Sequence, residues 1–231
     1  MSEALGAALT LLTDLDPKLV EIVFLSLAVS LSAVGIAALF GFPLGAAIAV
    51  GRFPGRQSLI VLLNANMGLP PVVVGLVVYL LLSRAGPLGS FGILFTPQAM
   101  VIAQTVLILP IIAALSRQAI EDAFREYDEQ LRSLGANRVQ AALTLLWDTR
   151  FSLLTTVLAG FGRAAAEVGA VMIVGGNIDG VTRVMTTAIA LETSKGDLPL
   201  ALGLGIILLT VVLMLNFGAS VIKETARRRY G

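Results

Sequence analysis

The residues able to do chemistry are few, and their types are restricted. The 231-residue sequence contains no cysteine and no histidine, which removes disulfides, thiolate metal sites, cysteine nucleophiles and imidazole acid–base chemistry. One ionisable pair, Arg163 and Glu167, lies inside a long apolar stretch. Side chains four residues apart on a helix can neutralise each other. We expect a structural ion pair, with an oxyanion site at the arginine as the alternative, because charges inside a membrane are functional candidates.

The composition is that of a membrane protein. The chain is 57% hydrophobic and 13% charged, with a mean hydropathy of +0.91. A soluble domain this apolar would lack the polar residues to cover its surface. The net charge of +1 provides no basic field for nucleic acid. None of the three lysines follows a glycine, so no P-loop is present, and ATP-driven transport would need an ATPase from another chain.

Five apolar stretches are long enough to cross a hydrocarbon core of about 30 Å. They predict an all-α fold, a polytopic bundle of five transmembrane helices. The stretches cover residues 20–50, 57–83, 97–116, 151–174 and 198–222. Together they define a transmembrane domain, 19–222, followed by a basic cytoplasmic tail, 223–231. We expect an interfacial segment at 1–18, although a frayed tail explains that segment equally well.

Two polar groups interrupt this pattern and are candidate parts of a translocation pathway. The second stretch contains Asn64, Asn66, Pro70 and Pro71. Proline frees backbone carbonyls, which are tolerated in a membrane only where protein or a wet cavity satisfies them. A break here could line a pathway, and a packing kink is the alternative. A short amphipathic helix near residues 181–189 offers three hydroxyls as neutral anion donors, or as ordinary polar lining: Thr182, Thr186 and Thr187.

A charged hairpin, residues 117–150, separates the third and fourth stretches. Gly135 is placed to end its first helix, because glycine adopts the left-handed C′ conformation at little cost. Asn137 and Gln140 have the spacing of a capping box for a second helix. The first helix should carry an apolar face made of five residues at spacings of three and four: Ile120, Phe124, Tyr127, Leu131 and Leu134.

Basic residues predict the orientation. With the hairpin inside, the inner segments hold eleven of the 16 lysines and arginines, the outer segments hold four, and Arg163 lies in the membrane. The positive-inside rule then places the N-terminus outside and the hairpin and C-terminus in the cytoplasm. The hairpin is therefore predicted on the side where a cytoplasmic ATPase could reach it.

The hairpin resembles the EAA loop of ABC-transporter permeases, in which E-A-A-x-x-x-G precedes an apolar helix. Glu129 and Gly135 have the family spacing, whereas Gln130 and Leu131 replace the two alanines. The resemblance implies a type I importer permease fold in the cytoplasmic or inner membrane, with the hairpin seated on an ATPase. It implies a set of ATPase-coupling residues: Glu129, Leu134, Gly135, Ala136, Asn137 and Arg138.

Two further stretches resemble the molybdate, tungstate and sulfate branch of these permeases. One is Pro70-Pro-Val-Val-Val-Gly75, followed by Gly86-Pro-Leu-Gly89. The other is Gly162-Arg-Ala-Ala-Ala-Glu-Val-Gly169, followed by Gly175-Gly-Asn-Ile178. The run from Thr182 to Glu192 is most similar to tungstate permeases.

The resemblance implies a subunit that does no chemistry on its substrate. Two copies of the chain would pair on an ATPase dimer, which holds the ATP and Mg, and an extracytoplasmic binding protein would deliver the oxyanion. The pathway candidates are Asn64, Asn66, Pro70, Pro71, Arg163 and Glu167. Molybdate, sulfate or another solute are alternatives to tungstate. An ATP-independent channel or carrier is a second class, and an intramembrane enzyme, disfavoured by the absent histidine and cysteine, is a third.

Overall fold

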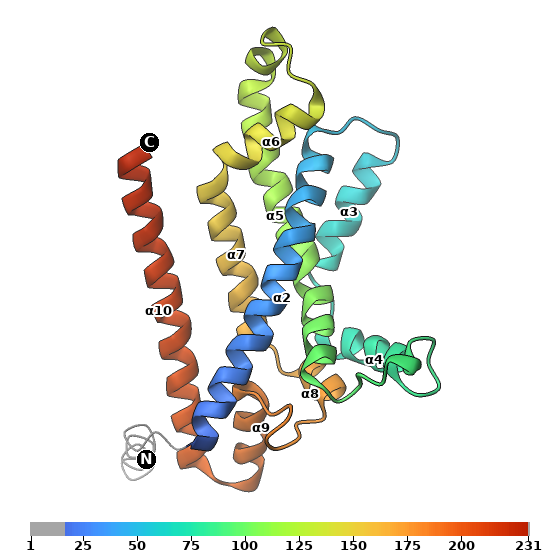
Figure 1. The fold of residues 1–231 in the computed structure, drawn as a ribbon, viewed down its shortest axis with the longest axis vertical. Helices are drawn as coiled ribbons and strands as arrows, with labels where there is room; N and C mark the ends of the chain where they lie inside the picture. Colours follow the sequence, from blue (N-terminus) through green and yellow to red (C-terminus); the bar gives the residue numbers. More distant parts are fainter. Residues whose placement is uncertain (1–16, 231) are drawn as a thin grey trace. The chain divides into compact units, whose positions relative to one another are not determined.

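The computed structural model describes residues 17–230, and every regular element in that range is a helix (Figure 1). The all-α prediction is therefore confirmed. The predicted interfacial segment 1–18 lies outside the described residues, apart from two that begin α2. The elements are α2 (Pro17–Val50), α3 (Arg56–Asn66), α4 (Pro71–Leu82), η1 (Gly89–Phe91), α5 (Pro97–Ser133), α6 (Arg138–Asp148), α7 (Arg150–Ala165), α8 (Gly169–Gly175), α9 (Met185–Lys195) and α10 (Leu198–Tyr230).

Three of these helices, α2, α5 and α10, are long and apolar enough to cross a membrane by themselves. The number rises to five if each of two bent pairs, α3 with α4 and α7 with α8, counts as one span. The five predicted stretches fall on these elements. Several membrane spans are thus confirmed, and the count of five and the orientation stay predictions.

The two bent pairs have different causes. In the second stretch, α3 ends at Asn66 and α4 begins at Pro71, preceded by Pro70 in an extended conformation. Proline suits the first position of a helix, where its missing N–H is no loss. The helix is thus interrupted at these prolines, and the pathway role of the break stays a prediction.

The stretch predicted as one span at 151–174 contains a break in its helix. Helix α7 ends at Ala165, and α8 begins at Gly169. Between them the carboxylate of Glu167 accepts a hydrogen bond from the backbone N–H of Ala170, at 3.0 Å. A side chain that satisfies a backbone donor in this way favours a new helix start over continuation of the old one.

Two boundaries predicted from the sequence, at residues 117 and 223, lie inside continuous helices. Helix α5 is 37 residues long and continues from the third apolar stretch through the first half of the hairpin. Likewise, α10 continues through residues 223–230, which were predicted as a separate tail. The first half of the charged hairpin is therefore a continuation of the apolar helix, with no break at residue 117.

The described chain divides into two compact units, each with its own packing. The first comprises 17–33, 70–104 and 162–217. Small residues allow close helix approach in it, since a Cβ placed on Gly75 of α4 would lie 2.7 Å from the Cα of Ala170 in α8. An apolar cluster also joins parts of α2, α9 and α10: Leu19, Met185, Ala188 and Leu204.

The second unit comprises 34–69, 105–161 and 218–230. Its α2 and α5 segments touch at Gly45, where a Cβ would lie 2.8 Å from the carbonyl oxygen of Ala113 and 2.9 Å from the backbone nitrogen of Arg117. An apolar core from α2, α5 and α6 lies beside this contact. It is formed by Ala46, Ala49, Val50, Ile120 and Leu145. This unit contains the hairpin.

We predict that Gly45→Ala destabilises the chain by about 1–3 kcal/mol, the usual cost of overpacking, because the new methyl group would meet backbone atoms of α5. Gly35→Ala is the matched control, since it lies in the same helix and a Cβ there has no neighbour within 4 Å. Thermal unfolding of the detergent-purified variants measures the difference. Equal melting temperatures for the two variants would show that the α2–α5 contact is not tight.

Candidate functional site

The hairpin turns at an ordered elbow, which we define as residues 129–138. Gly135 has φ +73°, in the left-handed region predicted for it. The N–H of Gly135 donates to the carbonyl of Arg132, and the N–H of Ala136 donates to that of Leu131, both at 2.9 Å. These two bonds form a Schellman motif, which satisfies carbonyls at the end of α5. The corner is thus closed by its own backbone.

The second half of the elbow is the predicted capping box. The side-chain oxygen of Asn137 accepts from the N–H of Gln140, and the side-chain oxygen of Gln140 accepts from the N–H of Asn137, both at 2.9 Å. Reciprocal bonds of this kind satisfy two backbone donors at the start of a helix. The direction of α6 is therefore set within three residues of the turn.

The apolar face of the first helix packs as predicted over most of its length. Ile120 is fully buried, and Phe124, Tyr127 and Leu131 pack against the same core. Leu134 was also predicted on this face, but its exposed fraction is 82%. The reason is that α5 ends at Ser133, so Leu134 belongs to the corner and no longer follows the helical period.

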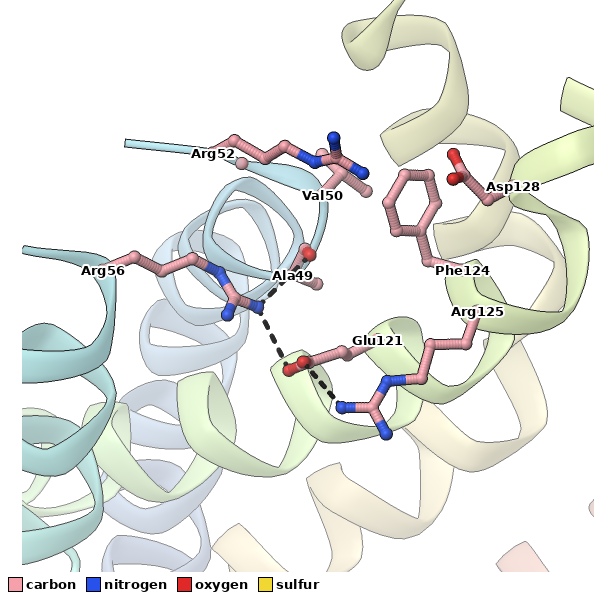
Figure 2. A pocket seen from close by; sticks show the side chains of 9 residues that line it. Ala49, Val50, Arg52, Arg56, Glu121, Phe124, Arg125 and Asp128 are labelled. Atoms are coloured by element: carbon pink, nitrogen blue, oxygen red, sulfur yellow. Dashed lines mark hydrogen bonds and ion pairs between the residues drawn. The ribbon is translucent and has the colours of Figure 1, made fainter. Parts of the chain in front are cut away.

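A charge cluster attaches the hairpin to the end of α2. The Glu121 carboxylate accepts from Arg56 at 3.2 Å and from Arg125 at 3.1 Å (Figure 2). It also pairs with Arg117. Arg56 in addition donates from Nε to the carbonyl of Ile48 at 2.8 Å, near the end of α2. One guanidinium thus bridges α2 and α5.

Glu121 lies beyond the uncharged part of α5, residues 97–116. Burial raises the pKa of its carboxyl, but the hydrogen bond and charge of Arg56, the charge of Arg117 and the hydrogen bond from Arg125 outweigh burial and hold that pKa below its ordinary value. The carboxylate therefore stays ionised and available to its three arginines.

In the first unit, Arg163 and Glu167 form the expected ion pair at 2.7 Å. The two partners differ in environment, because the side chain of Glu167 is 3% exposed and that of Arg163 is 33% exposed. Thr186 donates from its hydroxyl to the backbone carbonyl of Glu167 at 2.7 Å. Glu167 is therefore tied to α8 and α9 as well as to Arg163, which favours a structural role for the carboxylate.

Residues 41–230 match the family described as binding-protein-dependent transport system inner membrane component. The chain belongs to this family. It is a membrane-embedded transport permease, and the predicted membership of a permease family is confirmed. Permeases of this family work with a binding protein and an ATPase.

Relatives of this permease are named for transport of anions. It is 41% identical over 216 residues to a tungstate uptake system permease protein of Peptoclostridium acidaminophilum, covering 94% of this chain and 95% of the relative. It is 41% identical over 203 residues to a probable anion ABC transporter permease protein of Haloferax volcanii, covering 86% and 88%. A sulfate transport system permease protein of Salmonella typhimurium is 29% identical over 185 residues, covering 77% and 67%. The relatives are named as permeases, not as enzymes.

Apart from the ion pair of Arg163 and Glu167, the pathway candidates of this permease lie at the break in the second stretch. Asn64 and Pro70 are exposed and Asn66 and Pro71 are half-buried at the break between α3 and α4. The side chains of Asn64 and Asn66 make no hydrogen bond with any described residue, so both amides can contact another molecule.

The hydroxyls of the threonines considered as anion donors form hydrogen bonds with the backbone instead. Thr182 is fully buried, donates to the carbonyl of Gly175 at 2.6 Å and accepts from the N–H of Ile178 at 2.9 Å. Thr187 is also fully buried and bonds both backbone groups of Val184. Their hydroxyls hydrogen-bond the backbone of the turn between α8 and α9.

Residues 17–230 contain no group of three acidic, histidine or cysteine side chains that could hold a metal ion.

Sequence reasoning missed an exposed apolar stripe on α6. Val139, Leu143 and Trp147 are 69%, 63% and 73% exposed, while Ala141 and Leu145 face the core. The signal was present, because the three residues recur every fourth position. Their own unit leaves them uncovered, so the elbow and α6 together present an apolar surface.

We predict that Glu167→Gln has a smaller effect than Glu167→Ala. Glutamine keeps an acceptor for the N–H of Ala170 and loses only the charge, whereas alanine leaves both Arg163 and that N–H without their partner. Leaving a buried partner unpaired costs roughly 1–3 kcal/mol. Thermal unfolding in detergent measures this order. If the two variants melt at the same temperature, the backbone bond of Glu167 contributes nothing and only the ion pair matters.

Proposed function

We propose that this chain is the membrane subunit of an ATP-driven importer for a tetrahedral oxyanion, with tungstate as the foremost substrate. The substrate assignment is supported by the relatives' names, since the two at 41% identity are named for tungstate uptake and for an anion. Sulfate is the second candidate, supported by sulfate permeases at 29% identity. Molybdate shares the same tetrahedral chemistry.

The observation that carries the coupling mechanism is the ordered elbow with an exposed leucine. Leu134 projects from a corner whose backbone is fixed on both sides, by the Schellman motif and by the capping box. A rigid apolar knob that its own unit does not cover is suited to insertion into a pocket of another protein. We assign that pocket to the cytoplasmic ATPase, which would supply the ATP and Mg.

The contact set would be the one expected from the sequence. Glu129 is exposed and forms no ion pair with a described residue, which leaves its charge available to a partner. The rest of the set continues through the corner into the first turn of α6: Leu134, Gly135, Ala136, Asn137 and Arg138. ATP-driven closure of the ATPase would move two such elbows together and alternate the access of the pathway.

The remaining parts of the proposal concern the assembly. Two copies of the chain would pair, with the N-terminal end of α2 outside and the hairpin in the cytoplasm, in five spans. The binding protein would dock on the outer side. The amides of the exposed Asn64 and the half-buried Asn66, at the break marked by Pro70 and Pro71, would face the passing anion. Arg163 would attract it weakly, because Glu167 already neutralises much of the arginine's charge.

We predict that Gly135→Ala reduces coupled transport while Gly55→Ala does not. Both glycines have positive φ, +73° and +83°, and a Cβ on either would meet nothing within 4 Å. The conformational strain, about 1–2 kcal/mol, is therefore matched, and only the elbow is proposed to touch the ATPase. ATP-dependent uptake into vesicles carrying the assembled complex measures the difference.

Gly135→Pro is the stronger variant of the same test. Proline cannot adopt φ near +73° and removes the N–H that bonds Arg132. It should abolish uptake while the chain remains inserted in the membrane. Wild-type uptake by this variant would overturn the coupling assignment.

The substrate is tested by competition in the same vesicles. We predict that tungstate, supplied with the cognate binding protein, is taken up at lower concentration than molybdate or sulfate. Uptake must stop when ATP is withheld, because an ATP-independent channel would continue. Failure of every tetrahedral oxyanion to be taken up would refute the substrate class and leave the coupling assignment intact.

A further inference from the structure

Two cavities adjoin the Glu121 cluster in the second unit. Their volumes are about 390 Å³ and about 400 Å³. They share four lining residues, Val50, Arg52, Phe124 and Asp128, and so adjoin each other between the end of α2, the C-terminal turns of α5 and the start of α6. We call the two cavities together the hollow. Figure 2 shows Arg52 on the far side of the first cavity from Glu121.

The lining of this hollow carries more positive than negative charge. Its carboxylates are already satisfied, since Glu121 is shared by three arginines and Asp128 pairs with Arg132 at 2.9 Å. The surplus lies on Arg52 and Arg138, neither of which forms an ion pair with any described residue. In total, two carboxylates line the hollow beside five arginines: Arg52, Arg56, Arg125, Arg132 and Arg138.

The start of α6 adds to the positive electrostatic potential of the hollow. Asn137, Arg138 and Ala141, from the first turn of α6, line the second cavity. The start of a helix carries unpaired N–H groups and the positive end of its dipole, and both favour an anion. The end of α2 would have the opposite effect, but Arg56 donates to its carbonyls at Ile48 and Ala49, at 2.8 and 3.5 Å.

We propose that this hollow binds a phosphate-class anion through Arg52 and the start of α6. A guanidinium presents paired N–H donors that match two oxygens of a tetrahedral anion, and Arg52 has this fork free. Arg138 and Arg125 complete the rim. The anion is either a free phosphate-type ion of the cytoplasm or the phosphate of an anionic lipid headgroup, because both present the same oxygens.

This site is separate from the proposed translocation pathway and does not rest on the identity of the substrate. Arg138 belongs both to the hollow and to the elbow, and Phe124 and Arg132 lie on the helix that ends at the elbow. An anion held there would bridge the end of α2 and the start of α6. Its binding would therefore stiffen the hairpin and give the cell a way to modulate coupling.

Titration calorimetry on the detergent-purified full-length chain tests the proposal. The probes are inorganic phosphate, dioctanoyl phosphatidylglycerol and, as the uncharged-headgroup comparison, dioctanoyl phosphatidylcholine. We expect Arg52→Gln to weaken binding about tenfold, equivalent to about 1.4 kcal/mol, and Arg52→Lys to weaken it less. Arg84→Gln is the matched control, since Arg84 is also exposed and without an ion pair, and it lies in the first unit.

Each outcome decides the question. Saturable binding of phosphate that depends on Arg52 assigns a free-anion site, and binding of phosphatidylglycerol alone assigns a lipid headgroup. No saturable binding of either probe, or equal binding by Arg52→Gln and the wild type, overturns the proposal. Because Arg52 is exposed and forms no ion pair with a described residue, size-exclusion elution of the variant should match that of the wild type.

Discussion

The attachment of the hairpin to the end of α2 is the interaction on which the rest of the site depends. Glu121 sits between three arginines, and one of them, Arg56, also holds a carbonyl of α2. The neighbouring Ile120 is fully buried against the α2 and α6 core. Charge and apolar packing therefore fix the same turn of α5. Removing one partner from such a cluster leaves uncompensated, partly buried charge.

From that turn to the elbow the chain has no loose joint. Helix α5 is continuous to Ser133, a Schellman motif closes the corner, and a capping box starts α6. The elbow is thus joined to the Glu121 cluster by continuous, hydrogen-bonded backbone. The apolar surface that the elbow and α6 expose has no cover within its own unit, which fits a subunit whose family works in a multi-chain transporter.

Sequence predicted the local parts of this site and missed the long-range ones. Gly135, Asn137 and Gln140 lie within one six-residue stretch, so their types determine the turn. The break at Glu167 was missed, because the apolar pattern continues through it and only the bond to the N–H of Ala170 shows that the helix restarts. The bridge from Arg56 to Glu121 joins residues far apart in the sequence, and no local pattern encodes which arginine a carboxylate will meet.

The central claim is that Leu134 meets the ATPase, and cross-linking tests it most directly. The chain has no native cysteine, so a single Leu134→Cys variant can carry a thiol-reactive photo-cross-linker without background. In the assembled complex, this account predicts an adduct with the ATPase from Leu134→Cys and none from Ser90→Cys in η1, which is expected on the outer side. An assembled, ATP-hydrolysing complex that forms no adduct from Leu134→Cys, or forms it equally from Ser90→Cys, would contradict the account.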